Sequence, residues 1–393
     1  MTGHSSSRRA SGVVIAGALA TAMLGWPLHA DQTAQTTGAQ TTQTAATQQN
    51  GPAPTPTPEP WPDAKTLESR RVSAEGRRLF QTDEPLAFRF TANFKAVNGD
   101  MDEKSTKTYP ATIEFLDENG TKHSIDLQIR PRGHSRRRIC EHPPLRLEFP
   151  KEQAKGTVFD GHGALKLGTH CKPELDDYVQ REYAAYRIYN LLTPRSFRAR
   201  LARATYVDAK SGKEIETRNA MFIEDDDDVA KRLTGRVDDT EKLRFVHFDD
   251  DTLTLMMVFE YFIGNTDVSL YAQHNVNIVL TPKGVRYPVP YDFDYAGVVN
   301  ALYAVPGRGL GLATVRTRLY RGPCQPPSKL APAFDQIRSI RDRVTAIYDG
   351  LPGLKPAYRK DVQEYLGKFY KTIDNAIEVK KAFIDGCDGR PYM

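Results

Sequence analysis

The sequence predicts an α+β fold of two lobes, β-rich in the first half of the chain and mainly helical in the second. Residues 84–150 and 199–224 alternate apolar and polar side chains with the two-residue period of strands. From residue 250 onward, apolar residues recur at the spacing of helices. Strands followed by helices favour two packed units, and we expect the functional site in the cleft between them.

The first half contains several expected strands. In "EPLAFRFTANF" every second residue from Leu86 to Ala92 is apolar, as in a strand with one buried face. Residues 111–130 are two alternating segments around Asn119-Gly120, a strong signal for a hairpin turn. Residues 143–149 and 163–167 predict two further short strands.

Helices and a second hairpin follow. Residues 176–192 have the spacing of an amphipathic helix that begins at Asp176 or Asp177, and we expect its tyrosine rings to face the core. Residues 199–224 form a hairpin that turns at Ser211-Gly212. The second half predicts helices over 252–264, 332–351 and 357–384, with one strand pair at 276–280 and 285–293.

The first 30 residues have the layout of a secretory signal peptide. Arg8 and Arg9 precede an apolar run of 15 residues, and "LHA" suits cleavage after Ala30. The run is short for a bilayer-spanning helix, so a retained anchor is the less favoured alternative. We expect a periplasmic or secreted protein with no membrane span after cleavage. Losing Arg8 and Arg9 lowers the formal charge from +5 to +3, which argues against a nucleic-acid partner.

Residues 31–62 predict a disordered linker, because Thr, Gln, Ala and Pro cannot bury enough surface to order the chain. The expected domain is 63–393, with one lobe at about 63–224 and the other at about 225–393.

The chain has four cysteines, which in an exported protein indicate disulfides. They are Cys140, Cys171, Cys324 and Cys387. Three pairings are possible, and we favour Cys140–Cys171 with Cys324–Cys387 because each bridge then stays within its own region. The competing interpretation is a metal site of Cys140, His142, His170 and Cys171, although the spacing lacks the short paired loops of a zinc module.

Acidic and amide residues flank the strand pair of the second half. Asp267 follows a helix and precedes a strand, with Asn275 and Asn277 downstream, and "PYDFD" places Asp292 and Asp294 after the next strand. Oxygen ligands of this kind suit Mg²⁺ or Mn²⁺. The alternative is turn chemistry, which Asp and Asn commonly supply. Because buried carboxylates require partners, we favour the metal site, with Asn275 or Asn277 as its amide ligand.

A basic turn lies between two expected strands in "IRPRGHSRRRICEHPPLRLEF". Arg132, Gly133 and Ser135 stand in the turn and Arg146 on the strand after it, a set of guanidinium donors around a glycine that suits a phosphate cradle. The alternative is a solvated basic loop. Apart from Phe149 at its end, this stretch has no Phe, Tyr or Trp that would stack nucleic-acid bases.

These motifs in this order resemble the spore coat protein H (CotH) kinase family. The resemblance covers roughly residues 120–300 and rests on "RPRGHSRRR", "LKLGTHC", "DYVQREYAAYRIYNLL", "FIED", "GNTD…HN" and "PVPYDFDYAG". It implies an atypical protein-kinase-like fold for the two lobes. It also implies phosphoryl transfer from ATP, with Mg²⁺ or Mn²⁺, to hydroxyls of envelope or secreted proteins.

The resemblance implies roles for individual residues. Asp267 would be the catalytic aspartate, Asn275 and Asp292 the metal ligands, and Asp294 a second ligand or its support. The nucleotide would contact Arg132, Gly133, Ser135, Lys166 and Glu182, with Arg146 as an alternative basic side chain. We expect Glu182 to pair with Lys166, as the corresponding groups do in kinases.

The sequence also departs from ordinary kinases, and this keeps a second function open. It has no G-x-G-x-x-G loop and no H-R-D motif, and "DFD" replaces D-F-G. The alternative is therefore a catalytically inactive binding or structural protein of the cell envelope. A metal-dependent hydrolase is less favoured because no H-E-x-x-H motif is present. Two loops complete the predictions: Asp225–Asp228 as a solvated loop and 307–322 as a substrate-facing loop.

Overall fold

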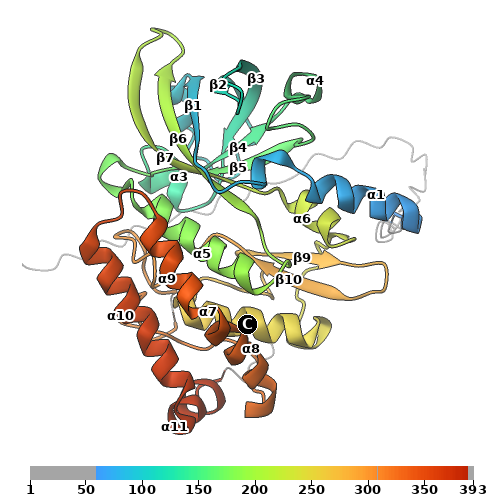
Figure 1. Ribbon diagram of the computed structural model, residues 1–393, viewed down its shortest axis with the longest axis vertical. Coiled ribbons are helices and arrows are strands. Elements are labelled where there is room, and N and C mark those ends of the chain that lie inside the picture. The colour runs from blue at the N-terminus through green and yellow to red at the C-terminus, as the bar shows by residue number, and fades with distance from the viewer. Residues whose placement is uncertain (1–58, 308, 388–393) are drawn as a thin grey trace, which may run out of the picture. The chain divides into compact units, whose positions relative to one another are not determined.

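Seven strands from the first half of the chain close into a barrel (Figure 1). The computed structural model describes residues 59–307 and 309–387. Around the barrel the order is β1 (Leu86–Ala92), β2 (Tyr109–Leu116), β3 (Lys122–Pro131), β4 (Leu145–Glu148), β5 (Ala164–Gly168), β7 (Glu214–Ile223) and β6 (Ala199–Asp208). Neighbouring strands are antiparallel except β1 and β6, whose parallel pairing closes the barrel.

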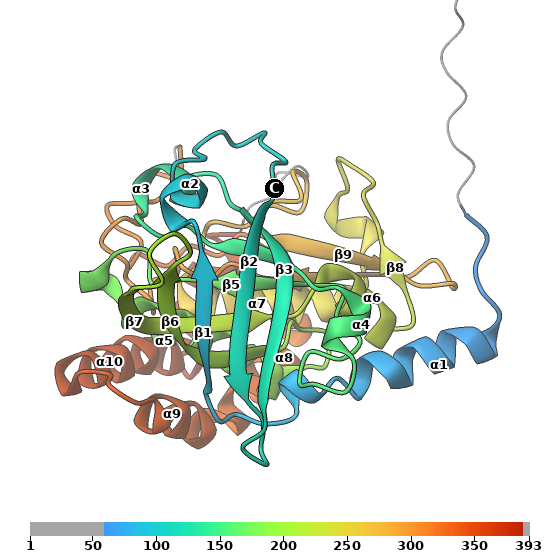
Figure 2. The same cartoon turned by 90° about the horizontal axis from the view of Figure 1, so that it is seen from above.

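The barrel interior is filled by the side chains that the alternation predicted. Leu86, Phe88, Phe90 and Ala92 of β1 are buried and pack with inward residues of the other strands, as expected for a small closed barrel. The predicted hairpins are confirmed by the β2–β3 and β6–β7 pairings. Figure 2 shows β1, β2 and β3 side by side on one face of the barrel.

The prediction of a two-lobed protein-kinase-like fold is wrong. The first-half strands form a closed, mixed, seven-stranded barrel, with helices mostly in the C-terminal part. The parallel pair joins Leu86 to Ala202, and nothing in the local pattern of either strand specifies that pairing. Contacts group the chain from Pro60 onward into one compact unit, and the expected boundary between lobes near residue 225 stays a prediction.

Helix α5 (Tyr178–Leu192) lies between the barrel and the C-terminal helices (Figure 1). The prediction that its tyrosine rings face the core is confirmed, because Tyr183, Tyr186 and Tyr189 are buried. The C-terminal helices that share this core are α7 (Asp250–Ile263), α8 (Pro327–Ser339), α9 (Arg341–Gly350) and α10 (Pro356–Ile373). A three-stranded sheet in the order β10 (Arg286–Pro290), β9 (Val276–Leu280) and β8 (Arg236–Val237) completes this part.

Several short elements were not predicted. They are α1 (Ala64–Glu75), α2 (Phe94–Asn98), α3 (Arg136–Ile139), α4 (Lys151–Ala154) and α6 (Asp226–Arg232), whereas α11 (Ala376–Val379) lies within the helix predicted over 357–384. Single 3-10 turns cover Arg78–Phe80, Pro173–Leu175 and Phe245–His247, and a π-helical turn covers Lys380–Ile384. Helix α1 packs along α6 on the outside of the barrel (Figure 2).

Two predicted helices are divided in the structure. The segment 332–351 breaks at Ile340 into α8 and α9. The segment 357–384 ends as a regular α-helix at Ile373, and Asn375 then caps α11 by accepting hydrogen bonds from the Ile377 and Glu378 amides. Periodicity alone does not locate such breaks, because buried residues continue on both sides of each break.

The two disulfides have the favoured pairing, Cys140–Cys171 and Cys324–Cys387. Disulfides are typical of oxidising compartments, which agrees with an extracellular or periplasmic protein. None of the helices in the described residues combines the length and apolar character that crossing a membrane requires. The expected signal peptide lies outside the described residues, as does the linker up to residue 58. Within 59–62, the Trp61 ring lies 4.3 Å from the Arg236 guanidinium.

Candidate functional site

The predicted catalytic aspartate lies in the turn after α7. The helix ends at Gly264 in the left-handed conformation (φ 71°), and the Asn265 side chain accepts a hydrogen bond from the Asp267 amide at 3.0 Å. Asn275 Nδ2 donates to the Asp267 carbonyl at 2.7 Å and to its Oδ2 at 3.0 Å. His274 Nε2 lies 3.2 Å from Asp267 Oδ1. The structure therefore joins Asp267 and Asn275 directly and adds His274, which sequence reasoning missed.

The "DFD" segment begins where β10 ends beside the start of β9, because the Tyr291 amide donates to the Asn275 carbonyl at 3.0 Å. Asp292 has a left-handed backbone (φ 62°), and its amide donates to the Tyr186 hydroxyl at 2.8 Å. Phe293 is buried between the rings of Tyr186 and Phe259. A non-glycine residue with positive φ is uncommon and concentrates at functional sites.

Arg136 is the buried centre of the acidic cluster. It contacts Asp292 by Nη2, and its Nε lies 3.3 Å from Asp294 Oδ2. Its Nη1 lies 3.6 Å from Glu182 Oε2, and its side chain is 8% exposed. One guanidinium therefore faces the carboxylates of Glu182, Asp292 and Asp294. The sequence did not reveal this role, because nothing in the run Arg136–Arg138 says which arginine points inward.

Burial, repulsion between the carboxylates and nearby cations give these three acids different pKa values. Burial raises the pKa of Glu182 to about 8 and that of Asp294 to about 7, although Arg136 opposes both shifts. Burial also acts on Asp292, but Arg136, Arg132, His274 and Lys166 outweigh it and lower its pKa. Asp292 is thus the carboxylate that the cations keep ionised.

Two oxygens of the cluster are incompletely paired. Glu182 Oε1 and Asp294 Oδ2 are buried and make no hydrogen bond among the described residues, although Asp294 Oδ2 faces Arg136 Nε. Buried carboxylate oxygens without donors favour a further cation. The donors therefore fit a hard divalent metal in chemical type.

Their geometry does not form a closed cage. Within the described part of the chain, the carboxylate oxygens of Asp267, Asp292 and Asp294 do not all lie within 4.8 Å of one another. The alternative amide ligand, Asn277, lies elsewhere, because its Nδ2 is 3.4 Å from the Asp226 carbonyl. Of the two amides, Asn275 is the one beside Asp267.

Lys166 of β5 pairs with Asp226 and not with Glu182, contrary to our expectation. Its Nζ lies 2.8 Å from Asp226 Oδ2 and 3.4 Å from the Glu224 carbonyl. Burial lowers its pKa, and Asp226 opposes that shift. Helix α5 instead directs Glu182 toward Arg136. The sequence order of a lysine strand and a glutamate helix did not determine which cation the glutamate meets.

The basic turn presents one unpartnered guanidinium. In the part of the chain that the structure describes, the Arg132 side chain makes no hydrogen bond or ion pair, yet its charge acts on Lys166, Glu182 and Asp292. Gly133 follows with φ 82° and open space where a Cβ would lie. Ser135 Oγ is 3.3 Å from the Tyr295 hydroxyl.

The acidic run Asp225–Asp228 is not a solvated loop. Asp225 caps α6 and accepts a hydrogen bond from Arg146 Nη1 at 2.8 Å, so Arg146 is already paired. Asp226 holds Lys166, and Asp228 lies 3.3 Å from His162. The run could have been recognised as a helix start, because acidic residues favour the first turn.

In the loop predicted to face a substrate, Arg316, Arg318 and Arg321 contact other parts of the protein. Arg316 binds Asp361 at 2.8 Å, and Arg318 donates to the Phe262 carbonyl at 3.0 Å. Arg321 donates to the Val268 carbonyl at 2.8 Å and thereby supports the turn that holds Asp267.

Two other regions are alternatives to the acidic cluster as the functional site. The cysteines of the alternative metal site form a disulfide, which removes them as ligands. A surface cavity of about 720 Å³ is lined by Tyr183, Arg187, Leu201 and Ile347 among others, and its lining contains none of the predicted site residues. We retain the Asp267–Asp292 region as the candidate site because it gathers the titratable groups with shifted pKa values.

Comparisons with known proteins add little to this geometry. No family model matches the chain, so membership of the CotH family has no support from them, and no curated protein matches it. One similar solved structure is that of a proinflammatory kinase, CtkA, from Helicobacter pylori. The alignment has 12% identity and a TM-score of 0.31, and it covers 56% of this chain and 88% of that one. The chain thus has a weak structural neighbour that is a kinase, too distant to define its fold or function.

Proposed function

We propose that this protein transfers the terminal phosphoryl group of ATP to a hydroxyl of an envelope or secreted protein. The supporting observation is that opposite charges converge on one region. Arg132, Lys166 and His274 all lower the pKa of Asp292, and Asp267 raises that of Asp294. Phosphoryl transfer needs cations for the phosphates, oxygen ligands for a metal and a carboxylate for the acceptor.

The basic residues would bind the nucleotide. Arg132 supplies a guanidinium fork that no described residue occupies, and Lys166 adds a buried ammonium. Gly133 has no Cβ, so a phosphate can approach the backbone of the turn. Ser135 is adjacent, whereas Glu182 would act through Arg136 and not through Lys166.

Asp292, Asp294 and Asn275 would hold Mg²⁺ or Mn²⁺. The buried oxygen of Asp294 that lacks a hydrogen bond fits this role. A divalent ion held there would neutralise charge on the phosphate oxygens. Arg136 contacts Asp292, so the Asp292 carboxylate would have to bind both the metal ion and the Arg136 guanidinium.

Asp267 would accept the proton of the acceptor hydroxyl. As the hydroxyl oxygen bonds to the γ-phosphorus, the bond from that phosphorus to the bridging oxygen breaks and ADP leaves. Asn275 and His274 fix the Asp267 carboxylate, since each contacts one of its two oxygens. The proton moves from the hydroxyl to Asp267, and no other reactant is needed.

The test is phosphate incorporation by the full chain from γ-labelled ATP with Mn²⁺. Asp267→Asn keeps the shape of the side chain but removes the proton acceptor, so we expect transfer to fall roughly 10²–10⁴-fold. Arg132→Gln should weaken ATP binding about tenfold, as loss of about 1.4 kcal/mol predicts. The control is Arg138→Gln, whose arginine is 63% exposed and pairs with Glu103. Transfer by wild type no greater than by Asp267→Asn would reject the proposal.

One observation favours a second function, an inactive nucleotide-binding or structural protein. Arg136 already occupies the carboxylates that a catalytic metal needs. In that case ATP with Mn²⁺ would stabilise the chain in a saturable thermal-shift titration, yet no phosphate would be incorporated.

A further inference from the structure

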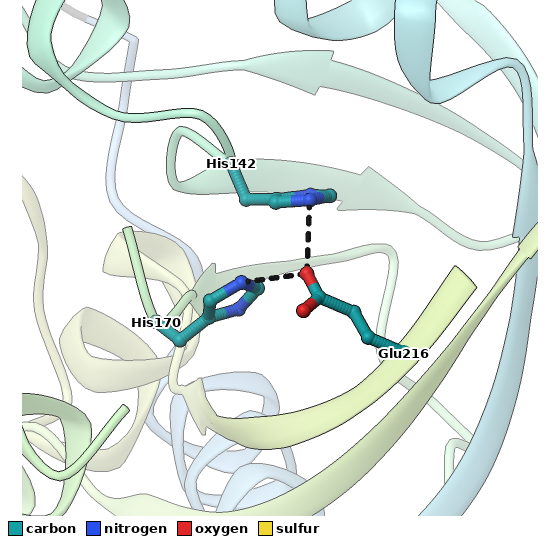
Figure 3. Close-up of side chains that lie close together, drawn as sticks. All are labelled: His142, His170 and Glu216. Carbon is teal, nitrogen blue, oxygen red and sulfur yellow. Dashed lines mark hydrogen bonds and ion pairs between the residues drawn. The ribbon is translucent and has the colours of Figure 1, made fainter. Parts of the chain in front are cut away.

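A second cluster shares no residue with the acidic site. His142 follows the Cys140 loop, His170 follows β5, and Glu216 lies on β7 (Figure 3). Their ligand atoms all lie within 4.8 Å of one another, and no other described trio of His, Cys, Asp or Glu residues does so. We propose that His142, His170 and Glu216 form a Zn²⁺ site that ties β7 to the two disulfide-linked loops.

The two distances from Glu216 to the histidines suit ligands of one tetrahedral ion. Glu216 Oε1 lies 3.1 Å from His170 Nε2 and 3.3 Å from His142 Nε2. In Figure 3 both ring nitrogens point at this single oxygen. Ligands of tetrahedral Zn²⁺ at 2.0–2.1 Å are about 3.3–3.4 Å apart, so a small movement admits the ion. Water would complete the coordination, because His142 and Glu216 remain 12% and 14% exposed.

The loops that carry the histidines are held together without a metal. The Cys140–Cys171 disulfide ends one residue after His170 and begins two residues before His142. The His142 amide donates to the Cys171 carbonyl at 3.0 Å, and Thr169 Oγ1 donates to the His142 carbonyl at 2.6 Å. Because the loops cannot separate, little ordering entropy opposes metal binding.

Neighbouring side chains orient the ligands. Arg218 Nη2 holds Glu216 Oε2 at 2.8 Å, which leaves Oε1 facing the histidines. The Tyr206 ring packs against both imidazoles, with centroids 4.9 Å and 5.5 Å away. Contacts of this kind around the ligands commonly fix a metal site.

The donor set selects the class of metal. Imidazole nitrogen favours Zn²⁺ and similar transition metals, whereas Mg²⁺ prefers oxygen ligands. The site is therefore distinct from the Mg²⁺ or Mn²⁺ site proposed for Asp292.

The test is calorimetric titration of chelator-treated full chain with ZnCl₂ in excess Mg²⁺. We expect one Zn²⁺ per chain, and Co²⁺ in its place should give the visible absorption of tetrahedral cobalt. His142→Gln and Glu216→Gln should each weaken binding on the order of 100-fold or more, since even outer-shell changes cost 10–100-fold. Both side chains are partly exposed, so the variants should fold, which circular dichroism would verify.

Two controls separate this proposal from simpler explanations. His123→Gln removes a histidine that pairs with Asp117 at 3.0 Å but has no second histidine, and it should bind Zn²⁺ as wild type does. Asp292→Asn should also bind normally, whatever its effect on phosphate transfer. Absence of stoichiometric binding to wild type, or unchanged binding by both ligand variants, would overturn the site and leave a hydrogen-bonded histidine–glutamate cluster.

Discussion

Arg136 is a single buried cation that faces three carboxylates. A buried charge without a partner costs several kcal/mol, so each acid depends on this guanidinium. The cation satisfies Asp292 best, and burial keeps Glu182 and Asp294 protonated to higher pH. The short turn α3 positions Arg136 by pointing it inward while Arg138 points into solvent.

Substitution of Arg136 should therefore be far more costly than substitution of its neighbour. Arg136→Met leaves buried acids uncompensated, and we expect the free energy of unfolding at pH 7 to fall by about 3–5 kcal/mol. Arg138→Met removes a surface pair with Glu103 and should cost less than about 1 kcal/mol. Urea denaturation of both variants measures this difference. Equal losses would show that Arg136 does not hold the cluster.

At the scale of elements, the end of α7 sets the position of Asp267. Gly264 adopts φ 71°, and the Asn265 amide returns to the Glu260 carbonyl at 2.8 Å. This reversal directs the chain past α10, whose Tyr365 hydroxyl would lie 1.9 Å from a Cβ at Gly264. The glycine is thus required twice, by the backbone conformation and by the close approach of Tyr365.

Gly264→Ala should show both requirements when it is compared with Gly120→Ala. Gly120 also has positive φ (77°) but has open space where a Cβ would lie, so its variant should lose only about 1–2 kcal/mol. Gly264→Ala adds overpacking against a buried ring and should lose a further 1–3 kcal/mol or so, roughly the usual cost of overpacking. Thermal unfolding of the two variants separates the cost of the backbone conformation from the cost of overpacking against Tyr365. Matching losses would mean that Tyr365 moves aside freely.

At the scale of the whole molecule, buried acids and buried histidines act on stability in opposite directions. Glu260 of α7 is buried, and burial raises its pKa to about 8, although Asn265 opposes the shift. Glu182 has the same value and Asp294 has a pKa of about 7. Their folded-state values lie above those of the unfolded chain. The folded protein therefore binds more protons than the unfolded chain does. Because of this difference, these groups make the free energy of unfolding fall as pH rises toward 8.

His142 and His170 have folded-state pKa values below the unfolded value, so they lower stability only at acidic pH. Above about pH 6.5, the unfolded value for histidine, His142 and His170 no longer act, whereas the acids and His274, whose pKa its contact with Asp267 raises, still do. We expect the free energy of unfolding to fall between pH 6.5 and 8 in the presence of a chelator. One proton contributes about 1.36 kcal/mol per pH unit, or roughly 2 kcal/mol over this range at most.

Glu260→Gln should make this fall shallower, because a neutral amide replaces one titrating group. The control is Glu118→Gln, which changes a glutamate that is 87% exposed and should keep the wild-type slope. Guanidinium unfolding at several pH values measures the slopes. A variant as steep as wild type would show that Glu260 does not titrate in this range.

Part of the site followed from local sequence. The positions of Asp267, Asn275 and Asp292 at strand and helix ends were predictable because apolar periodicity marks where elements stop. Their charge partners were not. Lys166 meets Asp226, Glu182 meets Arg136, and Arg146 meets Asp225, and each partner comes from an element whose packing is set by the whole core.

Features that depend on neighbouring residues along the chain were predictable from local pattern. These features are the alternation of β1, the hairpin turns and the buried tyrosines of α5. Tertiary structure alone decided the parallel pairing that closes the barrel, the inward direction of Arg136 and the meeting of Glu216 with two histidines. Periodicity and turn chemistry act over only a few residues along the chain. These contacts instead join segments that are far apart in the sequence, and only the packing of the whole protein brings such segments together.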